Sequence, residues 1–240
     1  MRKKVVWADL SDYGLPGDEE QAALAAVADT YYYCDRPDEA AFLERCQGAT
    51  AIVTDVMAIS KEIVDRLPDL ELISVLGVGA NQIDRAYVRS AGITLCNTPH
   101  YGDSTVAEFA LGLMLALSRH ILTADRSMRA GEWAAFPGKD LRGSTMGVVG
   151  LGGVGSELAA MGNALGMDVI CHTRRPTAER ALEHNVRFVE LDELMSTADF
   201  VQLATELNDE TTKLIERRYL ELMRPEAYLI NVARAALVDQ

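Results

Sequence analysis

Residues 145–166 read TMGVVGLGGVGSELAAMGNALG, an apolar run followed by glycines spaced as GxGxxG and then by a helix-forming segment. Gly150 allows a tight turn, Gly152 lets backbone N–H groups approach a diphosphate, and Gly155 lets the helix pack closely on the strand. The start of the helix adds about half a positive charge toward such an anion. Since a second apolar strand is expected at 167–172, the stretch predicts a dinucleotide-binding α/β fold.

The rest of the chain alternates short apolar runs with helix-like segments, a pattern typical of parallel sheets covered by helices. It predicts two doubly wound α/β domains with a boundary near residue 100. Residues 104–128 are mostly apolar and are expected to form one long, buried connecting helix whose Ser/Thr–Glu start caps it. The second sheet shows about four strands where a complete Rossmann domain has six, so we interpret the chain as a fragment. Strands are expected at 5–8, 31–33, 51–54, 72–76, 93–96, 145–149, 167–172, 198–203 and 228–232.

The composition is that of a soluble globular protein, with 49% hydrophobic and 25% charged residues among 240. The net charge of −13 argues against general binding to nucleic acids or to anionic membranes. The four cysteines lack CxxC spacing, so we expect no metal site, no disulfide framework and a reduced, cytoplasmic setting. Neither a signal peptide nor an apolar run of membrane-spanning length is recognised, and we expect no membrane partner.

Cofactor choice is predicted from the tip of the second strand, where an Asp or Glu usually holds the adenosine ribose. This chain has Thr173, Arg174 and Arg175 there. The change removes a charge that would repel a 2′-phosphate, and the arginines supply forked N–H donors to one. We therefore predict NADP as the preferred cofactor, with NAD also usable. An ordinary solvated loop is the alternative interpretation of the two arginines.

From about Leu72 to its last residue, the chain resembles the D-isomer-specific 2-hydroxyacid dehydrogenase family. The resemblance rests on the order of the blocks VLGVGANQID, GITLCNTPHYGDSTVAEFALGLMLALSR, GLGGVG, LDELMSTADFVQL, LNDETTKLI and LINVARAALVD. It implies a flavodoxin-like substrate domain over residues 1–100 and an incomplete Rossmann dinucleotide domain over 101–240. The implied activity is D-stereospecific hydride transfer between NAD(P)H and a small 2-oxo or 2-hydroxy acid, with glyoxylate or hydroxypyruvate as the expected substrate.

Two further expectations concern partners. Members of the family commonly form homodimers through the nucleotide domain and its long helix, so the resemblance implies a homodimer. The alternative to an enzyme is a dinucleotide-sensing binding protein of the corepressor type, without turnover, because relatives of that kind use the same fold.

The resemblance also implies roles for particular residues. The backbone N–H groups of Val78 and Gly79 would hold the substrate carboxylate, unless they belong to an ordinary turn. Tyr101 would touch the substrate unless it is a packed aromatic, and Thr105 would lie near the nicotinamide unless it caps the helix. Arg234 is the catalytic candidate, clamping a 2-oxo acid through its carboxylate and keto oxygen, with a structural ion pair as the alternative. Cofactor contacts are also expected from Gly150, Gly152, Gly153, Val154, Gly155, Thr173, Arg174, Arg175, Ala204 and Val232.

Three departures from the family pattern bear on these expectations. Ala235 stands where a Gly is usual after the arginine, which predicts a slightly displaced loop. Glu206 places a negative charge on the expected adenosine side, unless Arg174 or Arg175 neutralises it. The histidine that serves as general acid, and its glutamate, are expected beyond Arg234 on strands outside this sequence. The histidines present are His100, His120, His172 and His184. We expect none of them to replace that acid.

Overall fold

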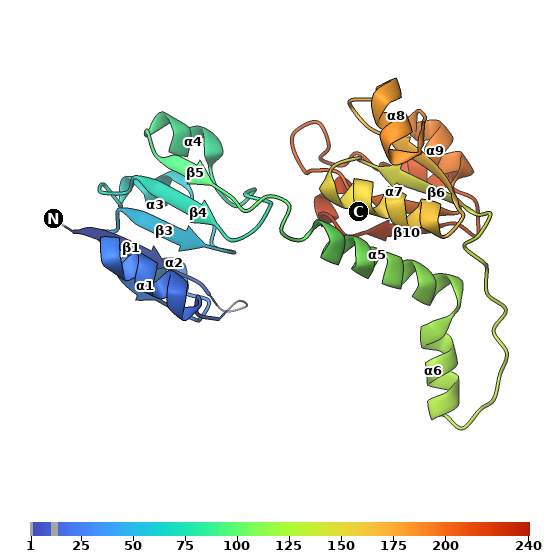
Figure 1. Cartoon of the computed structure of the whole chain (residues 1–240), viewed down its shortest axis with the longest axis horizontal. Coiled ribbons are helices and arrows are strands. Elements are labelled where there is room, and N and C mark those ends of the chain that lie inside the picture. Colours follow the sequence, from blue (N-terminus) through green and yellow to red (C-terminus); the bar gives the residue numbers. More distant parts are fainter. Residues whose placement is uncertain (1, 11–13) are drawn as a thin grey trace. The chain divides into compact units, whose positions relative to one another are not determined.

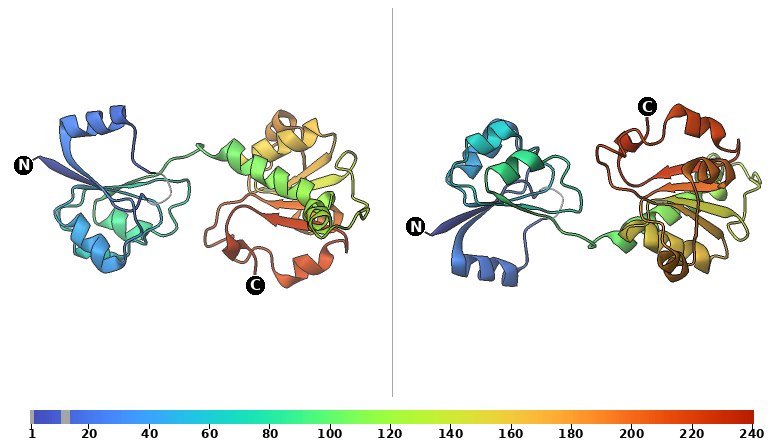
Figure 2. Two further views of the ribbon diagram at one scale, coloured as in Figure 1. Left: turned by 90° about the horizontal axis from the view of Figure 1, so that it is seen from below. Right: turned by 90° about the horizontal axis from the view of Figure 1, so that it is seen from above.

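A computed structural model describes residues 2–10 and 14–240 of the chain. They form two compact units, Met1–Tyr101 and Gly102–Gln240. Each unit is a parallel five-stranded sheet with helices on both faces (Figures 1 and 2). The predicted α/β class with two doubly wound parallel sheets is therefore confirmed.

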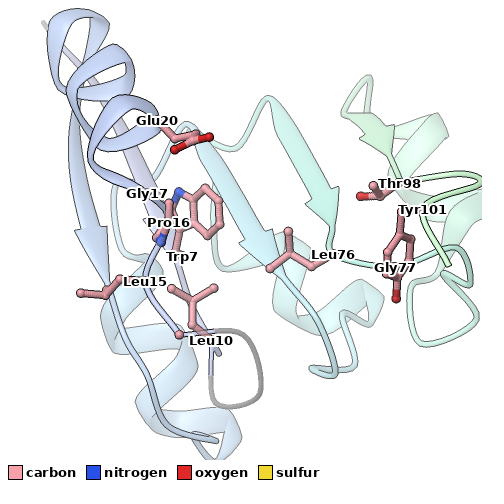
Figure 3. A pocket seen from close by; sticks show the side chains of 11 residues that line it. Trp7, Leu10, Leu15, Pro16, Gly17, Glu20, Leu76, Gly77, Thr98 and Tyr101 are labelled. Atoms are coloured by element: carbon pink, nitrogen blue, oxygen red, sulfur yellow. The ribbon is translucent and has the colours of Figure 1, made fainter. Parts of the chain in front are cut away.

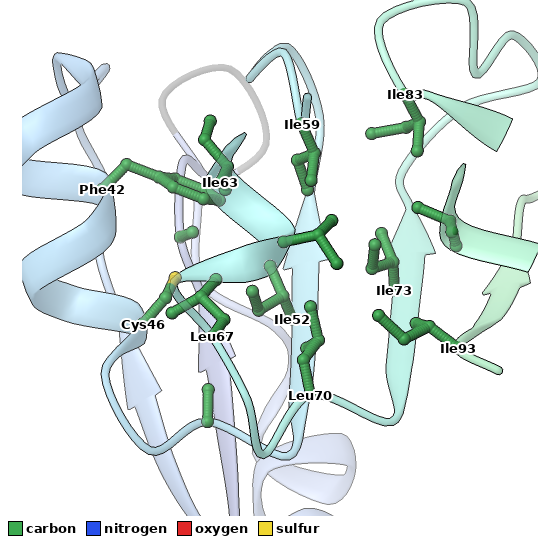
Figure 4. Packing of buried hydrophobic residues seen from close by; sticks show 14 of the residues in the cluster. Phe42, Cys46, Ile52, Ile59, Ile63, Leu67, Leu70, Ile73, Ile83 and Ile93 are labelled. Atoms are coloured by element: carbon green, nitrogen blue, oxygen red, sulfur yellow. The ribbon is translucent and has the colours of Figure 1, made fainter. Parts of the chain in front are cut away.

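The first unit has the strand order β2-β1-β3-β4-β5, which is the flavodoxin-like order. Apolar side chains from α2, α3 and the sheet form its core, in which Phe42, Ile52 and Ile73 are fully buried (Figure 4). Helix α1 covers the opposite face and buries none of its residues (Figure 2). The elements are β1 (Lys3–Trp7), α1 (Asp18–Val27), β2 (Ala28–Tyr32), α2 (Glu39–Cys46), β3 (Ala51–Thr54), α3 (Lys61–Asp65), β4 (Leu72–Val75), α4 (Arg85–Ser90) and β5 (Thr94–Cys96).

The second unit has the strand order β10-β9-β6-β7-β8. Numbered within the unit, this is 5-4-1-2-3, the Rossmann order over five of its six strands. Helices α5 and α7 cover one face, and α9 and α10 cover the other. The elements are α5 (Asp103–Ser118), α6 (Ile121–Arg129), β6 (Thr145–Val149), α7 (Gly153–Ala164), β7 (Asp168–His172), α8 (Ala178–His184), β8 (Arg187–Phe188), α9 (Leu191–Thr197), β9 (Phe200–Leu203), α10 (Arg217–Leu222), β10 (Tyr228–Asn231) and the short 3-10 helix η1 (Ala235–Leu237).

The expectation of about four strands in the second sheet was wrong by one strand. The missed strand, β8, has two residues and pairs with β7 through Ile170–Arg187 and Cys171–Phe188. A strand this short has no alternating pattern, so pairing with its neighbour defines it.

The single long helix expected over 104–128 is instead two helices, α5 and α6. The chain breaks at His120, whose φ of +52° is left-handed. The Lys139 N–H donates to the Ser118 carbonyl oxygen at 2.8 Å, which takes that acceptor away from a continuing helix. The end of α5 therefore coincides with a hydrogen bond from a residue that is distant in the sequence. No Gly or Pro lies beside the break at His120.

The expectation that this segment is buried holds for one face of α5 only. Ala107, Ala110 and Met114 are buried against the sheet, whereas Phe109 is 65% exposed. Helix α6 buries none of its residues. Within the described part of the chain, no single helix is long and apolar enough to cross a membrane. Helices α5 and α6 pass that test only when taken together, across a 61° bend.

Candidate functional site

The glycine turn joins β6 to α7 at the carboxyl edge of the second sheet. Gly150 has a φ of +99°, and a Cβ atom there would meet the backbone of Ala204 and Thr205 at 2.8 Å. A Cβ atom on Gly155 would overlap the carbonyl oxygen of Gly150. These two glycines are therefore required by the close approach of backbone to backbone.

Gly152 is required by no such contact. It is the N-cap of α7, and a Cβ atom there would meet nothing within 4 Å. Gly153 and Val154 begin the helix, so their amides belong to the first turn, where N–H groups have no partner within the helix. Open space beside the positive end of a helix suits an anionic ligand.

The strand ends bring the other expected cofactor residues to this same edge. The Gly150 N–H donates to the last carbonyl of β7 at 2.8 Å, and the Ala204 N–H donates to the last carbonyl of β6 at 2.9 Å. Strands β9 and β10 pair up to their final residues, so Ala204 and Val232 follow side by side. Thr173 follows β7 on the other side of the turn. The strand order reverses at β6, which is where open α/β sheets bind ligands.

The loop after β7 carries the two arginines considered for a 2′-phosphate. Arg174 pairs with Glu210 at 2.8 Å, and both side chains are more than half exposed. The partner of Arg174 is thus Glu210 rather than the Glu206 considered above. Because exposed pairs of this kind contribute little free energy, Arg174 is available to a competing phosphate. Arg175 is exposed and accepts a hydrogen bond at its carbonyl oxygen.

Arg180 is a residue that sequence reasoning missed. Its guanidinium donates to the Arg175 carbonyl at 2.9 Å and to the Leu151 carbonyl in the glycine turn. It therefore ties the loop after β7 to the turn that begins α7. From the sequence alone, an arginine in the first turn of a helix is expected to be solvated. No motif distinguishes Arg180 from such an arginine.

Arg234 follows β10, at the same carboxyl edge. The Asn231 side chain donates to the Arg234 carbonyl at 2.9 Å and accepts from the Ala233 N–H at 3.0 Å, which holds the turn. The guanidinium donates to the Ala233 carbonyl at 3.0 Å. Among residues 2–10 and 14–240, no acidic side chain forms an ion pair with Arg234, so the alternative of a structural ion pair gains no support.

The departure at Ala235 is tolerated by the backbone. Ala235 begins η1 and does not have a positive φ. A glycine is therefore not needed at this position, and the methyl group imposes no backbone strain.

In the first unit, the loop after β4 carries the residues expected to hold a carboxylate. The Thr98 N–H donates to the Gly77 carbonyl at 3.0 Å, and the Asn97 side chain donates to the Val78 carbonyl at 2.8 Å. Within the described ranges, the N–H groups of Val78 and Gly79 donate to no protein acceptor. Asn97 and Thr98 lie in the NTP stretch that sequence reasoning quoted without a role, and they orient this loop.

Tyr101 lines a pocket of about 300 Å³ in the first unit. The pocket is walled mainly by apolar side chains, including Trp7, Leu10 and Leu76, and it reaches the loop that carries Val78 (Figure 3). Tyr101 is 59% exposed, and both its expected contact with substrate and the alternative of a packed aromatic stay open.

Thr105 lies in the first turn of α5 and is exposed. The N-cap of α5 is Gly102, so the alternative that Thr105 caps the helix is wrong. Helix α5 begins at Asp103, so Thr105 is the third residue of the helix. Its hydroxyl is thus not used as an N-cap.

Side-chain contacts characterise two of the histidines, and unusual backbone conformations characterise the other two. His172 Nδ1 lies 3.2 Å from the Val189 carbonyl oxygen, and His184 Nε2 lies 3.7 Å from the carboxylate of Glu183. His100 and His120 both have left-handed backbone conformations, with φ of 65° and 52°. These contacts and conformations describe local structure, and the expectation that none of these histidines is the general acid stays a prediction.

Residues 111–240 match the family model described as "D-isomer specific 2-hydroxyacid dehydrogenase, NAD binding domain". The chain is 35% identical over 215 residues to a glyoxylate reductase of Thermococcus litoralis, covering 85% of this chain and 64% of the relative. It is 34% identical over 207 residues to a glyoxylate reductase of Pyrococcus horikoshii, covering 82% and 62%. The chain thus spans less than two thirds of the length of these relatives.

Solved structures are similar over nearly the whole chain. An acyclic imino acid reductase in complex with NADPH and D-Arg has a TM-score of 0.89 and 27% identity, covering 98% of this chain and 76% of that one. A glyoxylate reductase from Paecilomyes thermophila has a TM-score of 0.88 and 27% identity, covering 99% and 75%. These relatives are named as reductases, which gives the corepressor alternative no support.

Proposed function

The chain belongs to the D-isomer specific 2-hydroxyacid dehydrogenase family, and from this premise we propose that it acts in hydride transfer between NAD(P)H and a small 2-oxo or 2-hydroxy acid. The observation that carries the proposal is the open space beside Gly152, the N-cap of α7, on the sheet edge that also bears Arg234. The relatives named glyoxylate reductases support glyoxylate as a substrate. In this proposal residues 1–100 form the substrate domain and residues 101–240 the dinucleotide domain.

Each candidate residue then has a chemical task. Bound nicotinamide would supply or accept the hydride, and the substrate oxygen would take up a proton in reduction or release one in oxidation. The first-turn amides of α7 bind the diphosphate, and Arg180 keeps that turn and the loop after β7 in place. The amides of Val78 and Gly79 bind the substrate carboxylate. Arg234 pairs with the 2-oxo acid and stabilises the negative charge that develops on its keto oxygen.

The reaction itself tests the proposal. The intact protein is mixed with NADPH or NADH and glyoxylate or hydroxypyruvate, and loss of reduced cofactor and formation of the D-2-hydroxy acid are measured. We expect turnover with a clear cofactor preference. Dinucleotide binding without turnover of any 2-oxo acid would contradict the proposal.

Cofactor preference is proposed to lie with NADP, through Thr173 and Arg174. Thr173→Asp is expected to lower the ratio of kcat/KM with NADPH to that with NADH by about tenfold or more, since the new carboxylate repels a 2′-phosphate and accepts from ribose hydroxyls. Thr173→Asn, which has a similar shape and no charge, is the control and is expected to change the ratio much less. An unchanged ratio in Thr173→Asp would remove the assignment.

We also propose a homodimer formed through α5, α6 and the segment that follows them. Phe109 is 65%, Leu122 62% and Trp133 91% exposed, a set of apolar side chains that suits burial by a second copy. Leu122→Asp is expected to halve the mass measured by light scattering, with Leu182→Asp on α8, where the side chain is 84% exposed, as the control. A monomeric wild type would contradict the proposal.

A reducing, cytoplasmic setting is part of the same proposal. All four cysteines are free, and burial raises the pKa of the Cys46 and Cys171 thiols to about 12, which keeps them unreactive. Cys34 and Cys96 are exposed free thiols, which suit a compartment that keeps thiols reduced.

A further inference from the structure

Asp103, in the first turn of α5, brings its carboxylate against the start of α7. A Cβ atom built on Gly153 would overlap the Asp103 carboxylate group, and all three of its nearest neighbours belong to that group. Helix α7 has no acidic residue in its own first turn. The negative charge at its N-terminus is therefore supplied by a neighbouring helix.

Packing of α5 against α7 fixes the position of this carboxylate. Ala107, Ala110 and Met114 of α5 share one buried cluster with Leu158 and Ala159 of α7. Asp103 lies in the turn that precedes these contacts and is itself partly buried. The side chain is short, so it has little freedom to leave the helix end without a change of rotamer.

A helix N-terminus attracts one anion through its free N–H groups and its dipole. A second anion at the same place is repelled by the first, because two like charges a few ångströms apart in a partly buried site interact strongly. The diphosphate of a dinucleotide would approach from the open side at Gly152, directly beside Gly153. The Asp103 carboxylate and the diphosphate therefore need the same positive helix end.

We propose that the Asp103 carboxylate competes with the cofactor diphosphate for the N-terminus of α7 and so weakens the binding of either dinucleotide. The inference rests on the proposed dinucleotide-binding function. Asp103 is here a positioning residue that acts on affinity, and it takes no part in hydride transfer.

Two consequences separate this effect from the action of Thr173 and Arg174. Those residues act on the 2′-phosphate, which only NADP carries, whereas Asp103 acts on the diphosphate, which NADH, NADPH and ADP share. Adenosine carries no phosphate, so its binding is independent of the Asp103 charge.

The test measures dissociation constants of NADH, NADPH, ADP and adenosine by titration calorimetry on the intact protein without substrate. Asp103→Asn and Asp103→Ser are each expected to bind the first three about three- to tenfold more tightly, with adenosine unchanged. The gain is expected to shrink as salt is raised, because screening weakens the repulsion. Asp103→Ser is included because it also removes the amide group of Asn, which is able to form hydrogen bonds at the helix end.

Asp192→Asn is the matched control, since it makes the same change in net charge in the first turn of α9, where Asp192 pairs with Arg218. It is expected to leave all four constants unchanged. Unchanged or weaker binding of NADH, NADPH and ADP in both Asp103 variants, with cooperative thermal unfolding intact, would overturn the inference while the proposed function stands. A wild type that binds no dinucleotide would overturn both.

Discussion

Arg234→Ala is expected to lower kcat/KM of the intact protein for its 2-oxo acid by about 10²–10³-fold while the dissociation constant for NADPH stays unchanged. The guanidinium has no acidic partner among the described residues, and two hydrogen bonds of the Asn231 side chain hold its turn besides the one that the guanidinium donates to the Ala233 carbonyl. The substitution therefore removes the fork that would clamp the substrate without disturbing the fold. Steady-state kinetics and cofactor titration measure the two quantities separately.

Arg234→Lys is the control, because lysine keeps the charge and lacks the planar fork. It is expected to recover part of the lost rate if charge matters, and to remain impaired because bidentate contact is lost. Near-normal kcat/KM in Arg234→Ala would rule out the catalytic assignment. A parallel loss of NADPH affinity would show instead that Arg234 serves the cofactor.

Alanine at Gly152 and alanine at Gly155 are expected to differ in their effect on the free energy of unfolding. Gly155→Ala places a methyl group on the carbonyl oxygen of Gly150, so α7 must shift, at a cost of about 1–3 kcal/mol or more in the free energy of unfolding. Gly152→Ala meets nothing within 4 Å and is expected to cost less than about 1 kcal/mol.

Cofactor binding is expected to fall at least about tenfold in both variants, for different reasons. In Gly155→Ala the first turn of α7 is displaced, whereas in Gly152→Ala the methyl group fills the space from which a diphosphate approaches. Chemical denaturation and titration with NADPH measure stability and affinity on the same samples. Full NADPH affinity in a stable Gly152→Ala variant would show that the ligand does not approach at this glycine.

The parts of this site that sequence predicts are those set by local backbone geometry. The strand bounds at Ala51–Thr54 and Thr145–Val149 follow directly from apolar runs that end at a turn residue or at Gly150. In a parallel sheet the residues after each strand share one edge, so Thr173, Ala204 and Val232 could be placed without coordinates. The conformation at Gly150 follows from the tight turn itself.

The parts that sequence does not predict depend on contacts between distant segments. Asp103 and Arg180 act on the glycine turn from other helices, and neither has a local pattern that reveals its neighbour. The break at His120 is accompanied by a hydrogen bond from Lys139, far along the chain. The exposed positions of α5 also include large apolar side chains, Phe109, Leu115 and Leu117, so apolar character alone does not distinguish its two faces.

The central claim is that the first-turn amides of α7 bind the diphosphate of a nicotinamide dinucleotide. Amide hydrogen exchange, measured by mass spectrometry with and without saturating NADPH, tests it most directly. We predict that the largest slowing of exchange falls on peptides covering residues 150–157, because their N–H groups become donors to the ligand. Exchange in those peptides that is unaffected by NADPH, with protection appearing elsewhere or nowhere, would contradict the account.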